Sequence, residues 1–242
     1  MRSIIILLSA SALAACNFAA GAQDNEGNGE ATERAFNVGS FEGVALAGSH
    51  DVVVTVGGPA AVRAEGDAEI IDRLDIRVEG GTLKIGTKSG NWPGNFMRNR
   101  GSATIYVTAP SLASAAVAGS GDMKVDKVEG SRFTGAIAGS GDLRIASMRV
   151  NEAEFSVSGS GDLAASGSAS SVKASVAGSG DLDLGELTSR QAEVAVVGSG
   201  DVRAHASDTA NISVTGSGNV TLSGGAKCSM SKRGSGEIHC EG

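Results

Sequence analysis

Apolar residues alternate with small or polar residues along most of the chain, and one tetrapeptide interrupts the alternation at regular intervals. Gly-Ser-Gly-Asp stands at 119–122, 139–142, 159–162, 178–181 and 198–201, and it returns as Gly-Ser-Gly-Asn at 216–219 and Gly-Ser-Gly-Glu at 234–237. Successive copies begin 18 to 20 residues apart. A fixed period of this length is typical of a solenoid, in which each repeat forms one coil stacked on the last.

Even-numbered positions on both sides of the tetrapeptide are apolar when each copy is numbered from its first glycine. Position −2 holds Val117, Ile137, Val157, Val176, Val196, Val214 and finally Lys232; position +4 holds Met123, Leu143, Leu163, Leu182, Val202, Val220 and Ile238. A period of two is expected of strands with one buried face. No helical pattern separates the copies, so the sequence predicts an all-β fold. We expect a single-stranded parallel β-helix, or β-solenoid, with coils of roughly 18–20 residues built as strand, bend, strand.

The pattern also suggests boundaries along the chain. We expect a signal peptide over 1–15, a flexible tether over 16–35, and a solenoid domain over 36–242 whose regular repeats occupy 113–242. Weaker copies, "LAGSHDVVV" at 46–54 and "VEGGTLKI" at 78–85, indicate that the amino-terminal third coils too. A helical turn near 68–74 and a projecting loop at 89–101 would interrupt it.

The amino terminus carries a secretion signal. Arg2 is followed by an apolar run, and Leu13-Ala14-Ala15-Cys16 looks like a bacterial lipobox, in which the cysteine is acylated. The alternative is an ordinary secretory signal cut near Ala14. Acylation of Cys16 would anchor the protein to a membrane. We therefore expect an envelope lipoprotein, in the outer membrane and facing the periplasm or the surface.

The tetrapeptide itself is best explained as a corner. Glycine tolerates positive φ, and the aspartate can accept hydrogen bonds from N–H groups freed in the turn. A dinucleotide-binding loop lacks its third glycine and its helix, and Gly-Ser-Gly-Asp is not a nucleophile elbow. Stacking would also align five carboxylates about 5 Å apart, where each neighbouring pair repels by about 3 kcal/mol at an effective dielectric of 20. Calcium is therefore an alternative ligand for this ladder, which consists of Asp122, Asp142, Asp162, Asp181 and Asp201.

Composition narrows the candidate chemistry. The formal charge of −7 without a basic cluster excludes nucleic acid as a partner, and aromatic residues make up only 3% of the chain. The three histidines have no spacing that suggests a zinc site. Cys228 and Cys240 occupy positions −6 and +6 of the last copy, both facing inward, and a secreted protein favours a disulfide between them. Two buried free thiols are the alternative.

Two outward surfaces are candidates for binding. Positions −3 and −1 carry small side chains, which would stack into a flat strip along the rod: Ala116/Ala118, Ala136/Ala138, Ser156/Ser158, Ser175/Ala177, Ala195/Val197 and Ser213/Thr215. This strip is either a mildly polar exterior or a contact face for another protomer or an extended polymer. The loop with Trp92, Phe96, Arg98 and Arg100 is the second candidate, because exposed Trp and Arg are frequent in binding hot spots. A plain packing role for Trp92 is equally open.

The tetrapeptide copies with their alternating apolar flanks, together with "EGDAEIIDRLDIRVEGGTLKI" at 65–85, resemble the head GIN domain family of auto-transporter adhesins. The resemblance covers about residues 36–242. It implies a right-handed parallel β-helix-like fold and a location in the envelope or at the surface. The adhesin label follows architecture and is not evidence of adhesion.

Two functions follow as hypotheses. The first is a non-enzymatic envelope lipoprotein whose solenoid presents a binding or scaffolding surface, adhesin-like, to an unknown protein or polysaccharide or to a second copy of itself. No catalytic residue and no cofactor other than the calcium alternative is expected for it. The second is a β-helix enzyme acting on polysaccharides, a lyase or hydrolase. That would need converging carboxylates and sugar-stacking aromatics, and the chain has one Trp and one Tyr.

Overall fold

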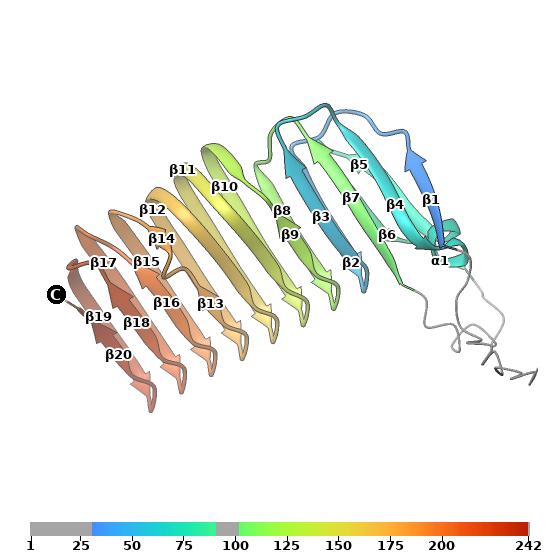
Figure 1. The fold of residues 1–242 in the computed structure, drawn as a ribbon. Coiled ribbons are helices and arrows are strands. Elements are labelled where there is room, and N and C mark those ends of the chain that lie inside the picture. The colour runs from blue at the N-terminus through green and yellow to red at the C-terminus, as the bar shows by residue number, and fades with distance from the viewer. Residues whose placement is uncertain (1–30, 91–101, 242) are drawn as a thin grey trace, which may run out of the picture.

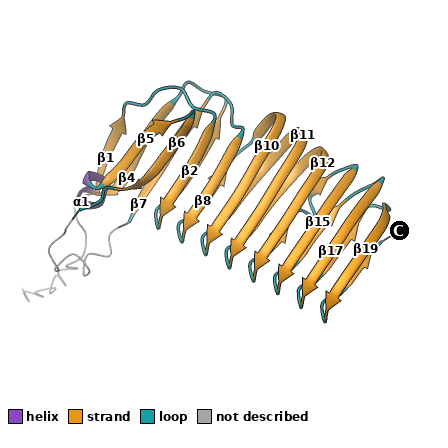
Figure 2. Ribbon diagram, turned by 180° about the vertical axis from the view of Figure 1, so that it is seen from behind, coloured by secondary structure: helices purple, strands orange, loops and turns teal. Residues whose placement is uncertain are grey.

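The chain folds into a long stack of β-coils (Figure 1). The computed structural model describes residues 31–90 and 102–241, which are almost entirely strand with one short helix. Sharp turns line one long edge of the stack and rounded bends line the opposite edge (Figures 1 and 2). The prediction of an all-β solenoid with coils of about 20 residues is confirmed. No ladder or contact tests the handedness, which stays a prediction.

Each regular coil contributes one strand that leads into its sharp corner and one that leaves it. The strands leading into the corners form the inbound sheet: β6 (Thr82–Thr87), β2 (Gly43–Gly48), β8 (Ser114–Gly119), β10 (Val128–Gly139), the second halves of β11 (Leu143–Gly159) and β12 (Leu163–Gly178), β15 (Gln191–Gly198), β17 (Thr209–Gly216) and β19 (Lys227–Gly234).

The strands leaving the corners form the outbound sheet on the other side of the core. Its members, in order along the stack, are β7 (Ala103–Ala109), β3 (Asp51–Val56), β9 (Met123–Val125), the first parts of β11 and β12, β13 (Leu182–Asp183), β16 (Val202–His205), β18 (Val220–Ser223) and β20 (Ile238–Cys240). A short third ladder closes the rounded edge, where 148–150 pairs with 128–130 and 167–169, and where β14 (Leu187–Thr188) pairs with 167–168.

The core consists of rows of equivalent side chains that stack in register from coil to coil. Val157 pairs with Ile137 on one side and Val176 on the other, and positions −2 and +4 are at most 2% exposed in the first six copies. Phe133 and Phe155, with ring centroids 6.3 Å apart, are the largest of the fully buried side chains. The predicted inward face of the alternation is therefore confirmed. Burial of these rows contributes about 25 cal/mol for each Å² of apolar surface removed from water.

The corners require glycine for two separate reasons. The first glycine of all seven copies has φ between 126° and 137°, where a side chain is strained. The second glycine lies against the corner one coil earlier. A Cβ added to Gly141 would come within 2.1 Å of the carbonyl oxygen of Gly121. In the first five copies the carbonyl of the first glycine also accepts two N–H groups from the next corner, as Gly119 does from Ser140 at 2.8 Å and Gly141 at 3.1 Å. The corner interpretation is confirmed.

The amino-terminal third departs from a simple solenoid. Strands β2 and β3 form one coil, and β6 with β7 flanks it, as the weak upstream repeats predicted. However, β5 (Leu74–Glu79) runs antiparallel to β6, and β4 (Ala61–Asp67) runs antiparallel to β7. The expectation that the amino-terminal third coils therefore holds for β2, β3, β6 and β7, and the sequence did not predict the antiparallel strands β4 and β5. These antiparallel strands and the helix α1 (Ala68–Asp72), which confirms the predicted helical turn, close this end of the stack.

The expected tether over 16–35 extends too far toward the fold. Strand β1 (Ala31–Phe36) pairs antiparallel with β4 along its whole length. Its short polar sequence has no clear apolar period, because it lies at the sheet edge and is held partly by ion pairs. Arg34 pairs with Asp72, and Arg63 pairs with Glu33 at 3.4 Å. The rest of the predicted tether and the predicted signal peptide lie outside the described residues.

Candidate functional site: the outward faces of the coil stack

The aspartate ladder is a hydrogen-bonding device along the corner edge. In five successive steps the backbone N–H of one corner donates to the carboxylate Oδ1 of the corner before it, at 2.8–3.1 Å; the acceptors are Asp122, Asp142, Asp162, Asp181 and Asp201. Asn219 continues the series and accepts the N–H of Glu237 through Oδ1 at 2.9 Å. These side chains accept backbone N–H groups as expected, but the donor belongs to the next coil and not to the same turn.

The ladder's charge is offset by those donors and by water. Asp122, Asp162 and Asp181 are exposed, and Asp142 and Asp201 are half-buried. Among residues 31–90 and 102–241, no three acidic, histidine or cysteine side chains form a group that could hold a metal ion. Calcium binding to the ladder stays an untested alternative, and its residues need no cation to account for their hydrogen bonds.

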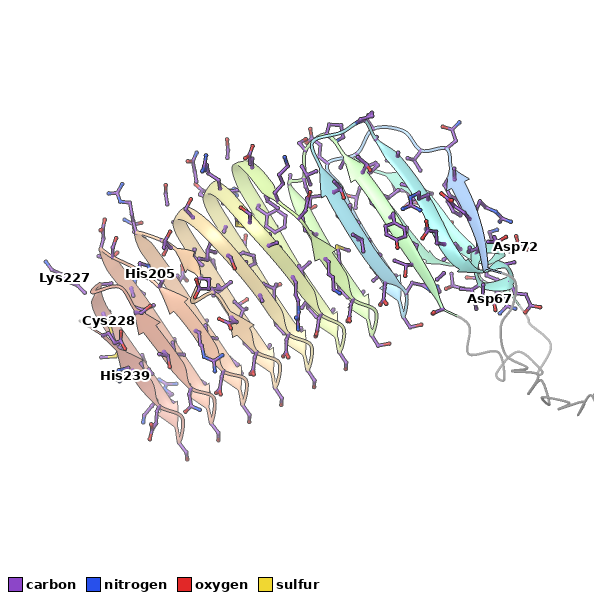
Figure 3. The ribbon with its side chains drawn as sticks, in the orientation of Figure 1. Asp67, Asp72, His205, Lys227, Cys228 and His239 are labelled. Atoms are coloured by element: carbon purple, nitrogen blue, oxygen red, sulfur yellow. A yellow bond between two sulfur atoms is a disulfide. The ribbon has the colours of Figure 1, made fainter. Side chains whose placement is uncertain are left out.

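The three histidines lie far apart. His50 takes the place of the second glycine in the first corner, where its Nε2 lies 3.3 Å from Thr87 Oγ1, and burial lowers its pKa although nearby Asp51 acts in the opposite direction. The other two, His205 on β16 and His239 on β20, are shown in Figure 3. His239 is exposed, as its odd position predicted.

The predicted flat strip is present on the outer face of the inbound sheet. Parallel register stacks Ala116 on Ala136 and continues through Ser156, Ser175 and Ala195. Side chains of the −1 row are exposed, and the largest apolar one among them, Val197, is 58% exposed. The strip therefore offers a regular surface that side chains of the same coil do not cover.

A furrow lies beside the strip, toward the rounded edge. It has a volume of about 430 Å³ and crosses β10, β11, β12, β15 and β17. We define the inbound furrow by two rows of stacked side chains, Glu152, Ser171 and Gln191 in one row and Glu154, Lys173 and Glu193 in the other. These residues were not among the candidates predicted from the sequence, which lay at positions −3 and −1. The signal was the polar or charged residue at positions −7 and −5, which every copy after the first carries.

The furrow's own charges are largely paired. Arg132 pairs with Glu152, and Lys173 pairs with Glu193 at 3.7 Å, both across neighbouring coils. A second hollow of about 260 Å³ adjoins it and shares Glu152, Ser171 and Gln191. At its rim Arg190 bonds Asp208 at 3.2 Å. Hydrogen bonds from Ser207 and then from Arg190 lower the pKa of Asp208, so this carboxylate stays charged in mild acid.

The outer face of the outbound sheet carries isolated charges. Arg203 pairs with Asp183 at 3.7 Å, and Arg144 approaches Asp142 at 3.9 Å. Near the amino-terminal end the Arg63 guanidinium lies 4.1 Å from the centroid of the Tyr106 ring. These contacts are ordinary surface pairs worth little each.

The carboxy-terminal coil is fastened by the predicted disulfide. Cys228 on β19 and Cys240 on β20 are bonded, with a Cα–Cα distance of 6.7 Å, so the bond joins the inbound and outbound sheets. Figure 3 labels Cys228 at the end of the stack that lies away from Asp67 and Asp72. No further coil covers this end within the described part of the chain, and Met230 is 55% exposed although it belongs to the inward series.

Two predicted sites lie outside the described residues. The first is Cys16, and the second is the group in the 91–101 stretch: Trp92, Phe96, Arg98 and Arg100. The strands that flank this stretch in sequence, β6 and β7, pair with β2 and β3 of a single coil. Among the described residues, no helix is both long and apolar enough to cross a membrane.

The stacked parallel ladders show that this is a parallel β-solenoid protein. Its repeated tetrapeptide forms the corners, and the outer faces of its two sheets are open to solvent. The family described as "putative auto-transporter adhesin, head GIN domain" matches residues 40–226, and the chain belongs to it. The resemblance seen in the sequence is thereby confirmed. No curated protein matches the chain.

Solved structures show the same fold at low identity. A crystal structure described as a putative adhesin from Bacteroides fragilis NCTC 9343 has a TM-score of 0.78 and 21% identity, covering 88% of this chain and 97% of that one. A putative lipid binding protein from Parabacteroides distasonis ATCC 8503 has a TM-score of 0.72 and 24% identity, with coverage of 89% and 98%. A putative adhesin from Parabacteroides merdae ATCC 43184 reaches 0.68 at 13% identity, with coverage of 89% and 98%.

Proposed function

We propose that this protein is a non-enzymatic binding module of the bacterial envelope, which holds a partner against the outer face of its inbound sheet. One observation carries the proposal. This face combines the exposed small-residue strip with the inbound furrow, and both repeat from coil to coil. Membership of an adhesin-named family supports an adhesin-like role at the cell surface or envelope.

The residue chemistry of the corners supports binding over catalysis. The Gly-Ser-Gly-Asp copies use their backbone groups and carboxylates to hold neighbouring corners together. A polysaccharide-cleaving enzyme needs two carboxyl groups set against a scissile bond and a shaped cleft. Each aspartate of the ladder instead uses one carboxylate oxygen to accept a hydrogen bond from the neighbouring corner. In this proposal the Gly-Ser-Gly-Asp repeat therefore has a structural role.

Bulky charged substitutions on the strip test the proposal. Ala138→Arg with Ala177→Arg places two long side chains on the inbound face, and Ala146→Arg with Ala164→Arg makes the same change on the outbound face. Binding of the purified protein to bacterial envelope fragments is measured by co-sedimentation. We expect the inbound variant to bind about tenfold more weakly and the outbound variant to bind like wild type, because side chains at the centre of an interface carry most of its energy. Equal binding by both variants would refute the proposed face.

Attachment to the membrane is the second part of the proposal. We propose that acylation of Cys16 anchors the protein in the outer membrane, with the segment before β1 as spacer. Labelling of producing cells with a palmitate analogue should mark the wild type and not Cys16→Ala. Labelled Cys16→Ala, or unlabelled wild type, would remove the lipid anchor and leave the binding face unaffected.

A further inference from the structure

The inbound furrow has the shape of a site for an elongated ligand. It crosses five strands, and its two rows are in register: Glu152 stacks on Ser171, which stacks on Gln191. The second row stacks Glu154, Lys173 and Glu193 in the same way. Neighbouring coils are about 4.8 Å apart. A ligand lying along the furrow therefore meets one pair of outward side chains at each coil, at a constant spacing that suits a polymer of repeating units.

The floor of the furrow offers a ligand no free backbone groups, so recognition depends on the side chains of the two rows. It is made by the backbone between the two rows, whose own side chains, Ala153, Val172 and Ala192, point into the core and are at most 4% exposed. This backbone is paired with strands on both sides. It has no free ladder edge to which a peptide could add as a strand. It also has no apolar pocket of the kind that anchors aromatic residues of a protein partner.

The lining chemistry points to a hydroxyl-rich, uncharged ligand. Carboxylates, amides, hydroxyls and an ammonium group alternate along the furrow, which supplies both hydrogen-bond donors and acceptors. Three carboxylates stand against Arg132 and Lys173, and each of these cations is already paired with one of them. An anionic chain would meet an excess of negative charge both here and over the whole protein, whose net charge is −7.

We propose that the inbound furrow binds a linear, uncharged polysaccharide that runs along the coil stack. The two rows hold its hydroxyl groups from both sides, and the strip lets the chain lie close to the sheet. This inference rests on the proposed function, because it names the ligand class for the same face. It is nevertheless separable from it, since a protein partner could use the strip while the furrow stays empty.

Titration with defined polysaccharides tests the inference. The full-length protein is titrated calorimetrically with mannan, dextran, laminarin and galactan, and with alginate as an anionic comparison. We expect binding to at least one uncharged polymer and none to alginate. An affinity that changes less than about twofold between low and high salt is also expected, because an uncharged ligand has no Coulomb attraction to screen. Binding of alginate alone, or of none of the five, overturns the inference.

Matched variants locate the site. Lys173→Ala with Glu193→Ala removes an ion pair of 3.7 Å inside the furrow, and Arg203→Ala with Asp183→Ala removes one of 3.7 Å on the outbound sheet. Both changes leave the net charge as it is. We expect a loss of about tenfold or more in affinity for the furrow variant and less than about twofold for the outbound variant. Ser171→Phe, which fills the furrow without removing a charge, should weaken binding similarly.

The outcomes separate the two proposals. Equal effects of the furrow and outbound variants, at melting temperatures close to wild type, overturn the furrow as the site. Envelope binding that is lost in Ala138→Arg with Ala177→Arg but unchanged by Ser171→Phe contradicts the furrow and leaves the proposed function standing. Release of shortened sugar chains during the titration would contradict both, since it would show turnover.

Discussion

At the residue scale, the second glycine of each corner has the strictest requirement, because it combines an ordinary backbone conformation with no room for a side chain. A Cβ on Gly141 would meet the Gly121 carbonyl oxygen at 2.1 Å and the Gly121 carbonyl carbon at 3.0 Å. Both atoms belong to backbone, which cannot move away as the end of a side chain can. This glycine therefore recurs because the corners stack too closely to admit a side chain.

Gly141→Ala should lower the free energy of unfolding by more than about 2 kcal/mol, because one extra methyl group is forced into a packed backbone contact. Gly130→Ala is the matched control, since a Cβ there meets no atom within 4 Å and φ is not positive. We expect it to change stability by less than about 0.5 kcal/mol. Urea unfolding followed by circular dichroism measures both. A tolerated Gly141→Ala would mean that the corners do not touch.

The aspartates of the ladder act through an oxygen acceptor and not through their charge. Asp162 Oδ1 accepts the Asp181 N–H at 2.9 Å. Asn219 shows that an amide oxygen can do the same work, because it accepts the Glu237 N–H at 2.9 Å. Asp162→Ala should therefore cost about 1 kcal/mol, the usual net value of such a bond, whereas Asp162→Asn should stay within about 0.5 kcal/mol of wild type.

Thermal melts of these two variants with and without calcium distinguish acceptor from cation site. On our account calcium changes neither the melting temperature of wild type nor the ranking of the variants. If Asp162→Asn were as unstable as Asp162→Ala, and calcium stabilised only wild type, the carboxylate charge would be the required feature. The ladder would then be a metal site.

At the element scale, the two ends of the stack are protected differently. The amino-terminal end is covered by the antiparallel strands β1, β4 and β5, whose edges carry many ion pairs. Glu79 at the end of β5 is one example. Hydrogen bonds from Lys84 and then from Arg77 lower its pKa to about 2. Its favourable charge state is therefore present above the ordinary glutamate range and is lost only as pH falls toward 2.

The carboxy-terminal end has no such cover among the described residues, and β19, its last inbound strand, carries Lys232 where the other copies carry valine or isoleucine. A charged residue facing inward at an edge is a known safeguard against strand pairing between molecules. Lys232 is exposed, since no coil covers it within the described part of the chain, so its charge costs little there and would be buried in an end-to-end contact.

Lys232→Val should promote end-to-end association, raising the dimer fraction about fivefold by light scattering at a fixed concentration. Lys227→Val is the control, because it removes the same charge from the same strand at an outward position. It should leave the dimer fraction unchanged. The same increase in both variants would show that lost net charge, and not an opened edge, causes the association.

The sequence predicted the regular two thirds of the fold well, because there one physical rule repeats. Alternation fixed which residues face inward, and the glycines fixed the corners. The sequence did not predict the non-repeating strands. Strand β1 has a polar sequence and is held by the ion pairs of Arg34 and Glu33. Strands β4 and β5 run antiparallel to their neighbours without any change in their period of two. A period of two cannot distinguish parallel from antiparallel pairing.

The candidate site was only half predictable. The strip at positions −3 and −1 follows from alternation, whereas a furrow depends on how the strands bend near the rounded edge, and the sequence gives no direct signal for that bend. In the sequence, charged residues at alternate outward positions, such as Glu152 and Glu154, indicate only an ordinary solvent-exposed surface. Their stacking in two rows beside buried Ala153 becomes visible only in the structure.

At the scale of the whole molecule, every surface described above depends on the stacking of one corner on the next. The register pairs Gly159 with Gly178 and Gly178 with Gly198, so the serines that follow them lie on neighbouring coils. If the coils were offset, neither the strip nor the furrow would exist, and the ladder could not form. All of these features therefore depend on the distance between equivalent corners.

Disulfide trapping at the corners measures that distance most directly. Ser160→Cys with Ser179→Cys places two thiols on adjacent corners, with Cα atoms about 4.8 Å apart, within the range that a disulfide spans. Ser160→Cys with Ser199→Cys places them two coils apart, about 9.6 Å, beyond it. After mild oxidation, peptide mass mapping should find the new bond in the first variant and not in the second. A bond in the second variant only, or in neither, would contradict the stacked corners.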